Sequence, residues 1–301
     1  MNISNLKNKM NGIIITNQDI GHNAYKIKRF TEEGKSLGIS LSHYVNDGSL
    51  AVIKNNKVDI KLPKDIDFVI YLDKDIYLAR ILEKAGYRLF NNADFIKLCD
   101  DKMLTNISVS GLPIKTPNTI AGPLFYSPEL KNENLNFLDT VISELKLPLI
   151  MKKVYGSLGT GVFLVNTKEE LVTLYKKYCR EPLQFQEYIS SSYGKSLRVI
   201  VIDKEIVGAF LRYNTSDFRS NFGPTATSKE YKLDGKFSAA IKVLIDAFNI
   251  EYAGVDLLFG ENDEPVLCEI NSNAFFEEFE KITKINVAKK FLEMVKRKLD
   301  E

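Results

Sequence analysis

Lysines set in apolar surroundings, followed by closely spaced glycines, mark the middle of this chain as a candidate anion-binding segment. The stretch LPLIMKKVYGSLGTGVFLV, residues 147–165, places Lys152 and Lys153 inside an apolar run. A lysine in an apolar strand must either extend its ammonium group to water or meet an anion. Successive residues of a strand point to opposite faces, so we expect only one of the two lysines to face a site.

The glycines Gly156, Gly159 and Gly161 lead into another apolar run and not into a helix. Gly-rich phosphate loops usually open a helix, whose first amides favour an anion. Here residues 162–165 have the composition of a strand, and the next helix begins only at a capping box over residues 167–170. The sequence therefore predicts a strand-to-strand turn that would cover a phosphate from above.

Oxygen-bearing side chains gather in two segments near the C-terminus, residues 252–260 and 265–271. Residues two apart in a strand share a face, so Glu269 and Asn271 project together, and Asp256 faces them if the segments pair through a turn at 261–264. Few carboxylates among oxygen ligands suit Mg²⁺, which shares its coordination shell with substrate phosphates. The pattern is equally compatible with exposed acids at strand ends.

Strands and helices alternate in the N-terminal part of the chain, which predicts a small α/β layer with parallel pairing and a limit near residue 92. The expected elements are strands at 12–16, 67–72 and 87–92, helices at 25–39 and 73–86, and a hairpin at 50–62 around Asn55-Asn56.

A helical segment over residues 92–110 and a Pro-punctuated stretch at 112–123 separate this layer from the rest. The further expected elements are helices at 137–146, 168–179 and 236–248, strands at 183–189, 196–202 and 205–213, a tight turn at Asp203-Lys204, a long polar loop at 214–231 and two terminal helices. We place three domains at residues 1–92, 93–186 and 187–301.

Bulk properties exclude several classes of partner. Lys and Arg number 41 and Asp and Glu 39, a formal charge of +2 that is too balanced for a protein that mainly binds nucleic acid. We find neither a signal peptide nor an apolar run of membrane-spanning length, and the cysteines Cys99, Cys179 and Cys268 lack metal-ligand spacing. The sequence predicts a cytoplasmic protein with reduced thiols, without a nucleic-acid or membrane partner.

The order of several motifs resembles the ATP-grasp carboxylate–amine ligases, and most closely the RimK-type branch that attaches amino acids to protein or peptide ends. The motifs are, in chain order, Lys102, MKKVYGSLGTGV, QEYI, SLRVIVI, FRSN, GVDLL and CEINSN. The resemblance extends from Lys102 to the C-terminus, and the preceding segment is similar to the N-terminal domain of that family. It implies an α/β (α+β) ATP-grasp fold that holds ATP between two mixed or antiparallel sheet layers.

The resemblance implies a nucleotide site. Lys102 and Lys152 would contact the phosphates, and adenine would meet a hinge at Gln186, Glu187, Tyr188 and Ile189. A mobile loop would close over the phosphates with its backbone amides, as an anion-binding nest in which glycine permits the close approach. That loop comprises Gly156, Ser157, Gly159, Thr160 and Gly161, and a second nucleotide contact comprises Arg219, Ser220 and Asn221.

The resemblance also implies a catalytic centre. Asp256, Glu269 and Asn271 would hold Mg²⁺, or Mn²⁺ in its place, against the phosphates of ATP. Arg198 would neutralise the acyl phosphate and the tetrahedral intermediate with help from Arg212, as fixed cations placed where charge develops. Surface charge on a strand is the alternative for Arg198.

Two departures from the family pattern affect the substrates. Relatives commonly have an acid just before the strand arginine, where this chain has Ser196-Leu197-Arg198, so Ser196 or a neighbour would make the ribose contact. Relatives also often have a Pro-Gly turn after the metal-binding Asn, whereas residues 271–286 read NSNAFFEEFEKITKIN. Because that turn borders the acceptor site, the identity of the substrate does not transfer from the family.

We expect an ATP-dependent ligase that forms an acyl phosphate and passes the acyl group to an amine acceptor, whether a free amino acid, a peptide or a protein tail. Such ligases are frequently homodimers. One alternative is a kinase of the same fold, and another is a nucleotide-binding module without turnover. The complete set of lysines, arginines and metal ligands argues against the binding module.

Overall fold

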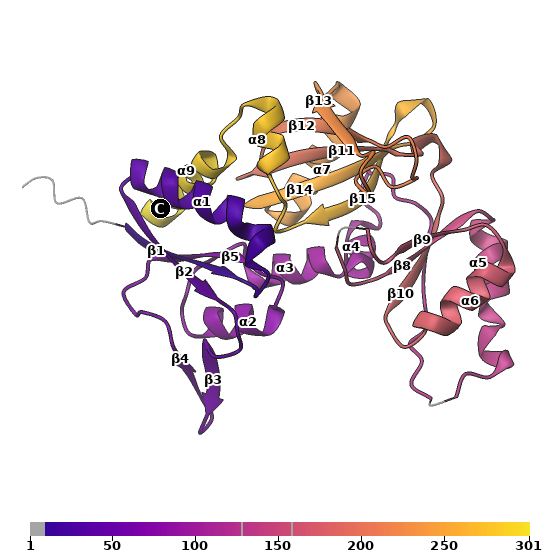
Figure 1. The fold of residues 1–301 in the computed structure, drawn as a ribbon, viewed down its shortest axis with the longest axis horizontal. Coiled ribbons are helices and arrows are strands. Elements are labelled where there is room, and N and C mark those ends of the chain that lie inside the picture. The colour runs from indigo at the N-terminus through magenta and orange to yellow at the C-terminus, as the bar shows by residue number, and fades with distance from the viewer. Residues whose placement is uncertain (1–9, 128, 158) are drawn as a thin grey trace, which may run out of the picture.

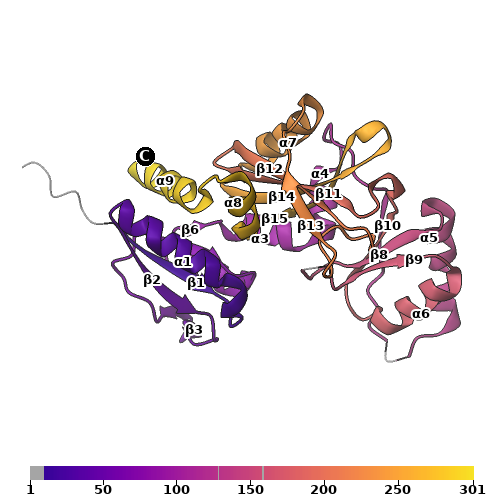
Figure 2. The ribbon, with the colours of Figure 1, turned by 45° about the horizontal axis from the view of Figure 1, so that its top comes forward.

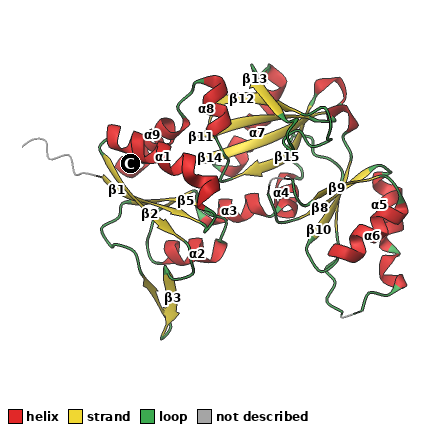
Figure 3. Ribbon diagram, in the orientation of Figure 1, coloured by secondary structure: helices red, strands yellow, loops and turns green. Residues whose placement is uncertain are grey.

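The computed structural model describes residues 10–127, 129–157 and 159–301 (Figure 1). Three sheets of four or five strands and one two-stranded hairpin lie in this part of the chain. Helices and strands are both present throughout, as Figure 3 shows by colour, so the predicted α/β class is confirmed. No helix in the described ranges combines the length and the apolar content that crossing a membrane would require.

The N-terminal sheet is parallel and has the strand order β2-β1-β5-β6. Ile13 and Ile15 of β1 point into one apolar cluster and Ile14 into another, so the strand is buried on both faces, as parallel strands usually are. Its elements are β1 Met10–Thr16, α1 Ile20–Ser36, β2 Ile39–Val45, β5 Phe68–Leu72, α2 Ile76–Lys84 and β6 Leu89–Phe90.

The predicted parallel layer is thus confirmed, but β2 was missed. Gly38 adopts φ +74°, which ends the run of α1, and the strand starts directly afterwards. The hairpin of β3 Ala51–Lys54 and β4 Lys57–Ile60 turns at Asn55 and Asn56, with φ values of 51° and 57°. Those values are typical of the tight turn that the Asn-Asn pair predicted.

The helix predicted over residues 92–110 is wrong as a single element. It is broken at Asp101 into α3 Ala93–Asp100 and α4 Lys102–Val109. The carboxylate of Asp101 accepts hydrogen bonds from the backbone of Met103 and Leu104, so it starts a new helix instead of continuing the old one. The break places Lys102 in the first turn of α4, beside the lid sheet.

The sheet that we call the lid sheet has the order β7-β10-β8-β9 and is antiparallel. Helices α5 and α6 cover its outer face, on the right of Figure 1. β8 and β9 are joined by the glycine stretch, which confirms the predicted strand-to-strand turn. The elements are β7 Thr119–Ala121, η1 Asn132–Leu135, α5 Phe137–Leu145, β8 Leu149–Lys153, β9 Val162–Val165, α6 Lys168–Tyr178 and β10 Leu183–Glu187.

One of the two hydrogen bonds of the capping box predicted before α6 is present in the structure. The Thr167 hydroxyl accepts from the backbone N–H of Glu170, 3.2 Å away. The Glu170 carboxylate accepts from the N–H of Asn166, one residue earlier than the motif predicts. The N–H of Glu170 in the first turn and the N–H of Asn166 just before the helix are thus both paired with side chains.

The C-terminal sheet is antiparallel, with the order β13-β12-β11-β14-β15. The predicted turn at Asp203-Lys204 joins β11 to β12, with φ values of 50° and 66°. The polar loop expected over residues 214–231 is shorter, because its end forms the edge strand β13. The elements are η2 Ser190–Ser192, β11 Lys195–Ile202, β12 Glu205–Tyr213, β13 Thr227–Glu230, α7 Gly235–Phe248, β14 Tyr252–Phe259, η3 Glu261–Asp263, β15 Pro265–Asn271, α8 Glu277–Thr283 and α9 Val287–Asp300.

One apolar cluster joins the N-terminal layer to the C-terminal sheet. Helix α9 lies beside α1 in both Figure 1 and Figure 2, and Phe291 of α9 packs with Phe30 of α1 and Phe90 of β6. The side chain of Asn91 adds polar links, since its Nδ2 donates to the carbonyls of Tyr252 and Ser272 at 2.8 and 2.7 Å. The N-terminal layer therefore holds the far ends of β14 and β15 in place.

Replacing Asn91 by Ala should destabilise the protein by about 3 kcal/mol, because it leaves buried backbone groups without partners. The Tyr252 N–H also donates to Asn91 Oδ1, at 3.1 Å, so three hydrogen bonds are lost together. Urea unfolding measures the change. Tyr77→Ala, at a side chain that is 80% exposed, is the control and should shift stability by no more than about 0.5 kcal/mol. Equal stability of the two variants would contradict the role assigned to Asn91.

Candidate active site

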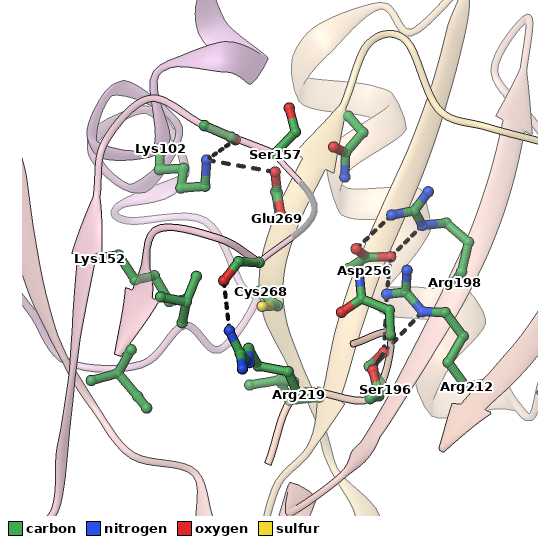
Figure 4. Close-up of a pocket in the computed structure, with 18 of the residues that line it drawn as sticks. Lys102, Lys152, Ser157, Ser196, Arg198, Arg212, Arg219, Asp256, Cys268 and Glu269 are labelled. Atoms are coloured by element: carbon green, nitrogen blue, oxygen red, sulfur yellow. Dashed lines mark hydrogen bonds and ion pairs between the residues drawn. The ribbon is translucent and has the colours of Figure 1, made fainter. Parts of the chain in front are cut away.

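A cleft of about 370 Å³ lies between the lid sheet and the C-terminal sheet (Figure 4). Of the residues that the sequence selected, Thr160 alone does not line it; its hydroxyl donates to the Ser157 carbonyl at 3.1 Å. The selected residues that line the cleft are Lys102, Lys152, Gly156, Ser157, Gly159, Gly161, Gln186, Glu187, Tyr188, Ile189, Ser196, Arg198, Arg212, Arg219, Ser220, Asn221, Asp256, Glu269 and Asn271.

Two of the lysines reach the cleft from different elements. Lys152 of β8 is 9% exposed, and no group in the described ranges accepts a hydrogen bond from it or forms an ion pair with it. The Lys102 ammonium donates to the carbonyls of Gly156 at 2.8 Å and Val154 at 3.3 Å and lies 3.8 Å from the Glu269 carboxylate. Burial lowers the pKa of Lys102 and Glu269 opposes that change. Lys152 is thus free to meet an anion, whereas an anion at Lys102 would replace its contacts with the two carbonyls.

Lys153 also lines the cleft, against the expectation that only one of the two lysines would face it, but its ammonium group is held by other side chains. Its ammonium lies 2.8 Å from the Glu181 carboxylate and 4.3 Å from the ring centroid of Tyr178. A charge already paired in this way has no need of a ligand.

The glycine loop is tied to both sides of the cleft. Gly156 and Gly159 have φ values of +139° and +71°, which L side chains rarely adopt. Arg219, in the loop after β12, donates to the Gly159 carbonyl at 2.9 Å and pairs with Asp217 at 2.8 Å. Lys102 and Arg219 thus hold carbonyl groups of the loop in this state (Figure 4).

The strand end at β10 forms the floor of one end of the cleft. Glu187 exchanges backbone and side-chain hydrogen bonds with Asn118, at 2.9 and 3.2 Å, which fixes the chain where it leaves the lid sheet. Tyr188 and Ile189 follow it along the cleft. The apolar side chains of Ile150, Val162 and Leu258, which sequence analysis did not select, line the cleft as well. Apolar walls next to accessible backbone suit a planar heterocycle.

Two arginines share one buried carboxylate on the C-terminal sheet. Arg198 of β11 lies opposite Asp256 of β14, and its Nη2 donates to Asp256 Oδ2 at 2.7 Å. Arg212 Nη2 lies 2.8 Å from Asp256 Oδ1. Burial alone would raise the pKa of Asp256, but the two guanidinium groups outweigh it and lower that pKa. The cluster retains an excess positive charge and can hold a further anion.

Ser196, which stands where relatives have an acid, is engaged by this cluster. Its hydroxyl lies 2.5 Å from the Ser220 hydroxyl and accepts from Arg212 Nη2 at 3.0 Å. The serine therefore positions Arg212 in the present structure.

Asp256, Glu269 and Asn271 lie on one face of adjoining strands. Asp256 is directly opposite Glu269 in the β14–β15 register, and Gly254 is opposite Asn271. Asn271 has a buried amide nitrogen with no partner, so its side chain is not committed to the protein. In the described ranges no group of three His, Cys, Asp or Glu side chains is arranged for a metal ion. Two carboxylates and one amide nevertheless fit Mg²⁺ shared with phosphates.

Sequence analysis missed Lys74, Asn273 and Phe275, which also line the cleft. The Lys74 ammonium lies 2.5 Å from the Asp100 carboxylate, and the residue is the second after the end of β5. Its position could have been predicted, because ligands of parallel sheets bind at the carboxyl ends of the strands. Nothing in the local pattern marks Asn273 or Phe275.

The comparisons with known proteins agree with this geometry. Residues 100–295 match the RimK-like ATP-grasp domain family. Human beta-citrylglutamate synthase B is 31% identical over 220 residues, which are 72% of this chain and 55% of that protein. Glutamate–LysW ligase ArgX of Sulfurisphaera tokodaii is 29% identical and matches 73% of this chain and 77% of that protein.

The fold has counterparts among solved structures. The D-alanine–D-alanine ligase of Bacillus anthracis, in a complex with ATP, superimposes with a TM-score of 0.72. The match covers 96% of this chain and 97% of that chain, at 17% identity. The expected ATP-grasp fold is confirmed. The chain belongs to the RimK-like ATP-grasp family and is an ATP-dependent ligase that joins a carboxylate to an amine.

Proposed function

We propose that this ligase binds ATP with Mg²⁺ in the cleft and activates a carboxylate there for attack by an amine. The proposal rests on one observation. Lys102, Lys152, Asp256 and Glu269 line one cleft, although these residues come from three separate parts of the chain. Buried ammonium groups on one wall and hard oxygen donors on the other match a triphosphate with its divalent cation.

ATP would lie with its adenine between Ile150, Val162 and Leu258, beside the backbone at Glu187 to Ile189. Its phosphates would reach Lys152 and Lys102 and replace the loop carbonyls that Lys102 now holds. The amides of the glycine loop would then point at the phosphates. Closing this loop keeps water from an intermediate that hydrolyses readily.

Asp256, Glu269 and Asn271 would hold Mg²⁺, which when bound would neutralise the phosphates and align the γ-phosphoryl group. Asp256 is shared with Arg198 and Arg212, so its charge already belongs to a cluster aimed at the reacting end of the cleft. The same proposal includes three domains, at residues 1–92, 93–186 and 187–301. It also includes Mn²⁺ as a substitute metal, a homodimer and a cytoplasmic location.

In the first step an oxygen of the substrate carboxylate attacks the γ-phosphorus of ATP and the bond to the bridging oxygen of ADP breaks. In the second step the amine attacks the carbonyl carbon of the acyl phosphate, loses a proton, and inorganic phosphate departs with the bonding electrons. Arg198 and Arg212 would stabilise the negative charge that develops on the carbonyl oxygen and the phosphoryl group. No nucleophilic side chain is required.

The names of two relatives point to glutamate as a substrate. Beta-citrylglutamate synthase B and glutamate–LysW ligase both carry glutamate in their names. We propose glutamate, or an acid of similar size, as one of the two compounds joined. Release of phosphate in step with ADP separates this reaction from that of a kinase, in which the phosphoryl group stays on the product.

Lys152→Met should weaken the binding of the ATP analogue AMP-PNP by about 10–100-fold, because a buried charge-assisted contact to phosphate is lost. Adenosine, which lacks phosphates, should bind as it does to the wild type. Isothermal titration measures both. Lys168→Met is the control, since that ammonium pairs with Asp139 outside the cleft. Equal AMP-PNP affinity of the two variants would contradict the proposed contact of Lys152 with phosphate.

Glu269→Gln should reduce the Mg²⁺-dependent part of AMP-PNP binding by about 100-fold, because the amide is a poor ligand for Mg²⁺. Titrations with Mg²⁺ and with EDTA separate this effect from any change at Lys102. Glu264→Gln, whose carboxylate pairs with Lys115 away from the cleft, is the control. The assignment of Glu269 to the metal is wrong if the variant keeps the full response to Mg²⁺.

A further inference from the structure

Lys26 of α1 is a buried lysine directly behind the wall of the cleft. The residue is 1% exposed, and its ammonium donates to Asn273 Oδ1 at 2.5 Å and to the Asn273 carbonyl at 3.4 Å. The ring centroid of Phe275 lies 4.5 Å from it. No carboxylate of the described residues pairs with this ammonium, and burial lowers its pKa to about 7. The surroundings of Lys26 therefore lack an anion.

Lys26 belongs to a set of donors that fix the loop of residues 272–276, between β15 and α8. Three consecutive carbonyls of this loop each accept a hydrogen bond from a side chain outside it. The pairs are Asn91 Nδ2 to Ser272 at 2.7 Å, Lys26 Nζ to Asn273 at 3.4 Å and Tyr252 Oη to Ala274 at 2.8 Å. The loop is thus held firmly where relatives often have a Pro-Gly turn.

The orientation of the Asn273 amide follows from its contact with Lys26. An ammonium group has donors only, so the oxygen of the amide must face it and the nitrogen must face elsewhere. Asn273 lines the cleft, and its Nδ2 has no hydrogen-bond partner in the described ranges. Lys26, when protonated, polarises this amide. The N–H group at Nδ2 can therefore donate a hydrogen bond to an oxygen of a ligand.

The same loop lies against the arginine cluster. A Cβ atom on Gly254 would come within 2.5 Å of Ala274 Cβ and 3.0 Å of Arg198 Nη1, so only glycine lets the loop pack there. This part of the cleft contains four basic groups, Lys26, Lys102, Arg198 and Arg212, and two carboxylates, Asp256 and Glu269; Glu278 is exposed at the rim. The excess positive charge favours an anionic substrate.

We infer that one substrate carries a carboxylate that takes no part in the reaction, and that this carboxylate accepts a hydrogen bond from Asn273 Nδ2, with Lys26 as the positioning residue. The inference rests on the proposed function, because it places the substrate beside Arg198. The ligand class is an amino acid or dicarboxylic acid with a free carboxylate remote from the reacting group. A neutral amide of the same size can accept the hydrogen bond through its oxygen, but it lacks the negative charge that would balance the basic groups and strengthen the bond.

Matched pairs of acid and monoamide test this preference. The probes are L-glutamate against L-glutamine and L-isoglutamine, and glutarate against glutaramate, titrated into protein saturated with AMP-PNP and Mg²⁺. The wild type should bind at least one acid about tenfold more tightly than one of its monoamides, as expected for a charge-assisted hydrogen bond. Equal binding of acids and amides, or no binding of any acid, would overturn the inference.

Variants assign the preference to Lys26. Lys26→Met should bring each acid within about twofold of its monoamide, whereas Lys26→Arg, which keeps charge and donors, should retain the difference. Lys28→Met is the matched control, because Lys28 lies on the same helix with its side chain 71% exposed. Asn273→Asp, which removes the donor and pairs with Lys26, should also abolish the preference. A preference kept by both Lys26→Met and Asn273→Asp would refute the assignment.

AMP-PNP affinity, measured in the same titrations, separates a failure of the inference about Lys26 from a failure of the proposed function. If the wild type binds AMP-PNP but shows no preference for acids, only the inference about Lys26 is wrong. If the wild type does not bind AMP-PNP, the proposed function fails and the inference fails with it. Normal AMP-PNP affinity in the Lys26 and Asn273 variants shows that their folds are intact.

Discussion

Lys152 is buried on β8 without an acceptor among the described residues, and it is one of several cations in this cleft that exceed the nearby carboxylates. Arg198 and Arg212 divide one carboxylate, that of Asp256, between them. Burying unpaired charge costs several kcal/mol per ion, so the remaining structure must hold these side chains against that cost. A bound polyanionic ligand would offset this cost of buried unpaired charge. The charges of the cleft are therefore balanced only when substrates are bound.

Strand pairing supplies the precision that such a charge arrangement needs. Arg198, Asp256 and Glu269 stand in one row across β11, β14 and β15, because each is the register partner of the next. Side chains on rigid strands keep their spacing within narrow limits. The glycine loop is different, since its glycines leave it adaptable, and Lys102 and Arg219 are the side chains from other segments that hold carbonyls of its described residues. The groups that we propose to act in the reaction are thus on strands, whereas the segment that we propose to close over the phosphates is a loop.

That residues from distant motifs line one cleft could be predicted from strand periodicity and from the order of the motifs along the chain. Strand alternation distinguished Lys152 from Lys153, but both lysines line the cleft, and only the contacts of Lys153 with Glu181 and Tyr178 show that its charge is already paired. The break at Asp101 was missed because a cap residue inside a helical pattern looks like a surface acid until its hydrogen bonds are known. Lys26 could not be found at all, because a helical lysine is usually exposed and its partner Asn273 is 247 residues away.

The residues that would bind ATP and the residues that would select the second substrate are held by different parts of the molecule. The groups that would handle ATP lie on the segments from Lys102 onward, where family motifs can be read. The groups beside the reacting end of the cleft depend on contacts from the N-terminal layer, through Asn91 and Lys26, to a loop whose sequence departs from the family pattern. A change in α1 can therefore alter the charge of the substrate pocket without touching the nucleotide. In this architecture the choice of substrate is carried by the packing between layers, and the chemistry of ATP by the sheets themselves.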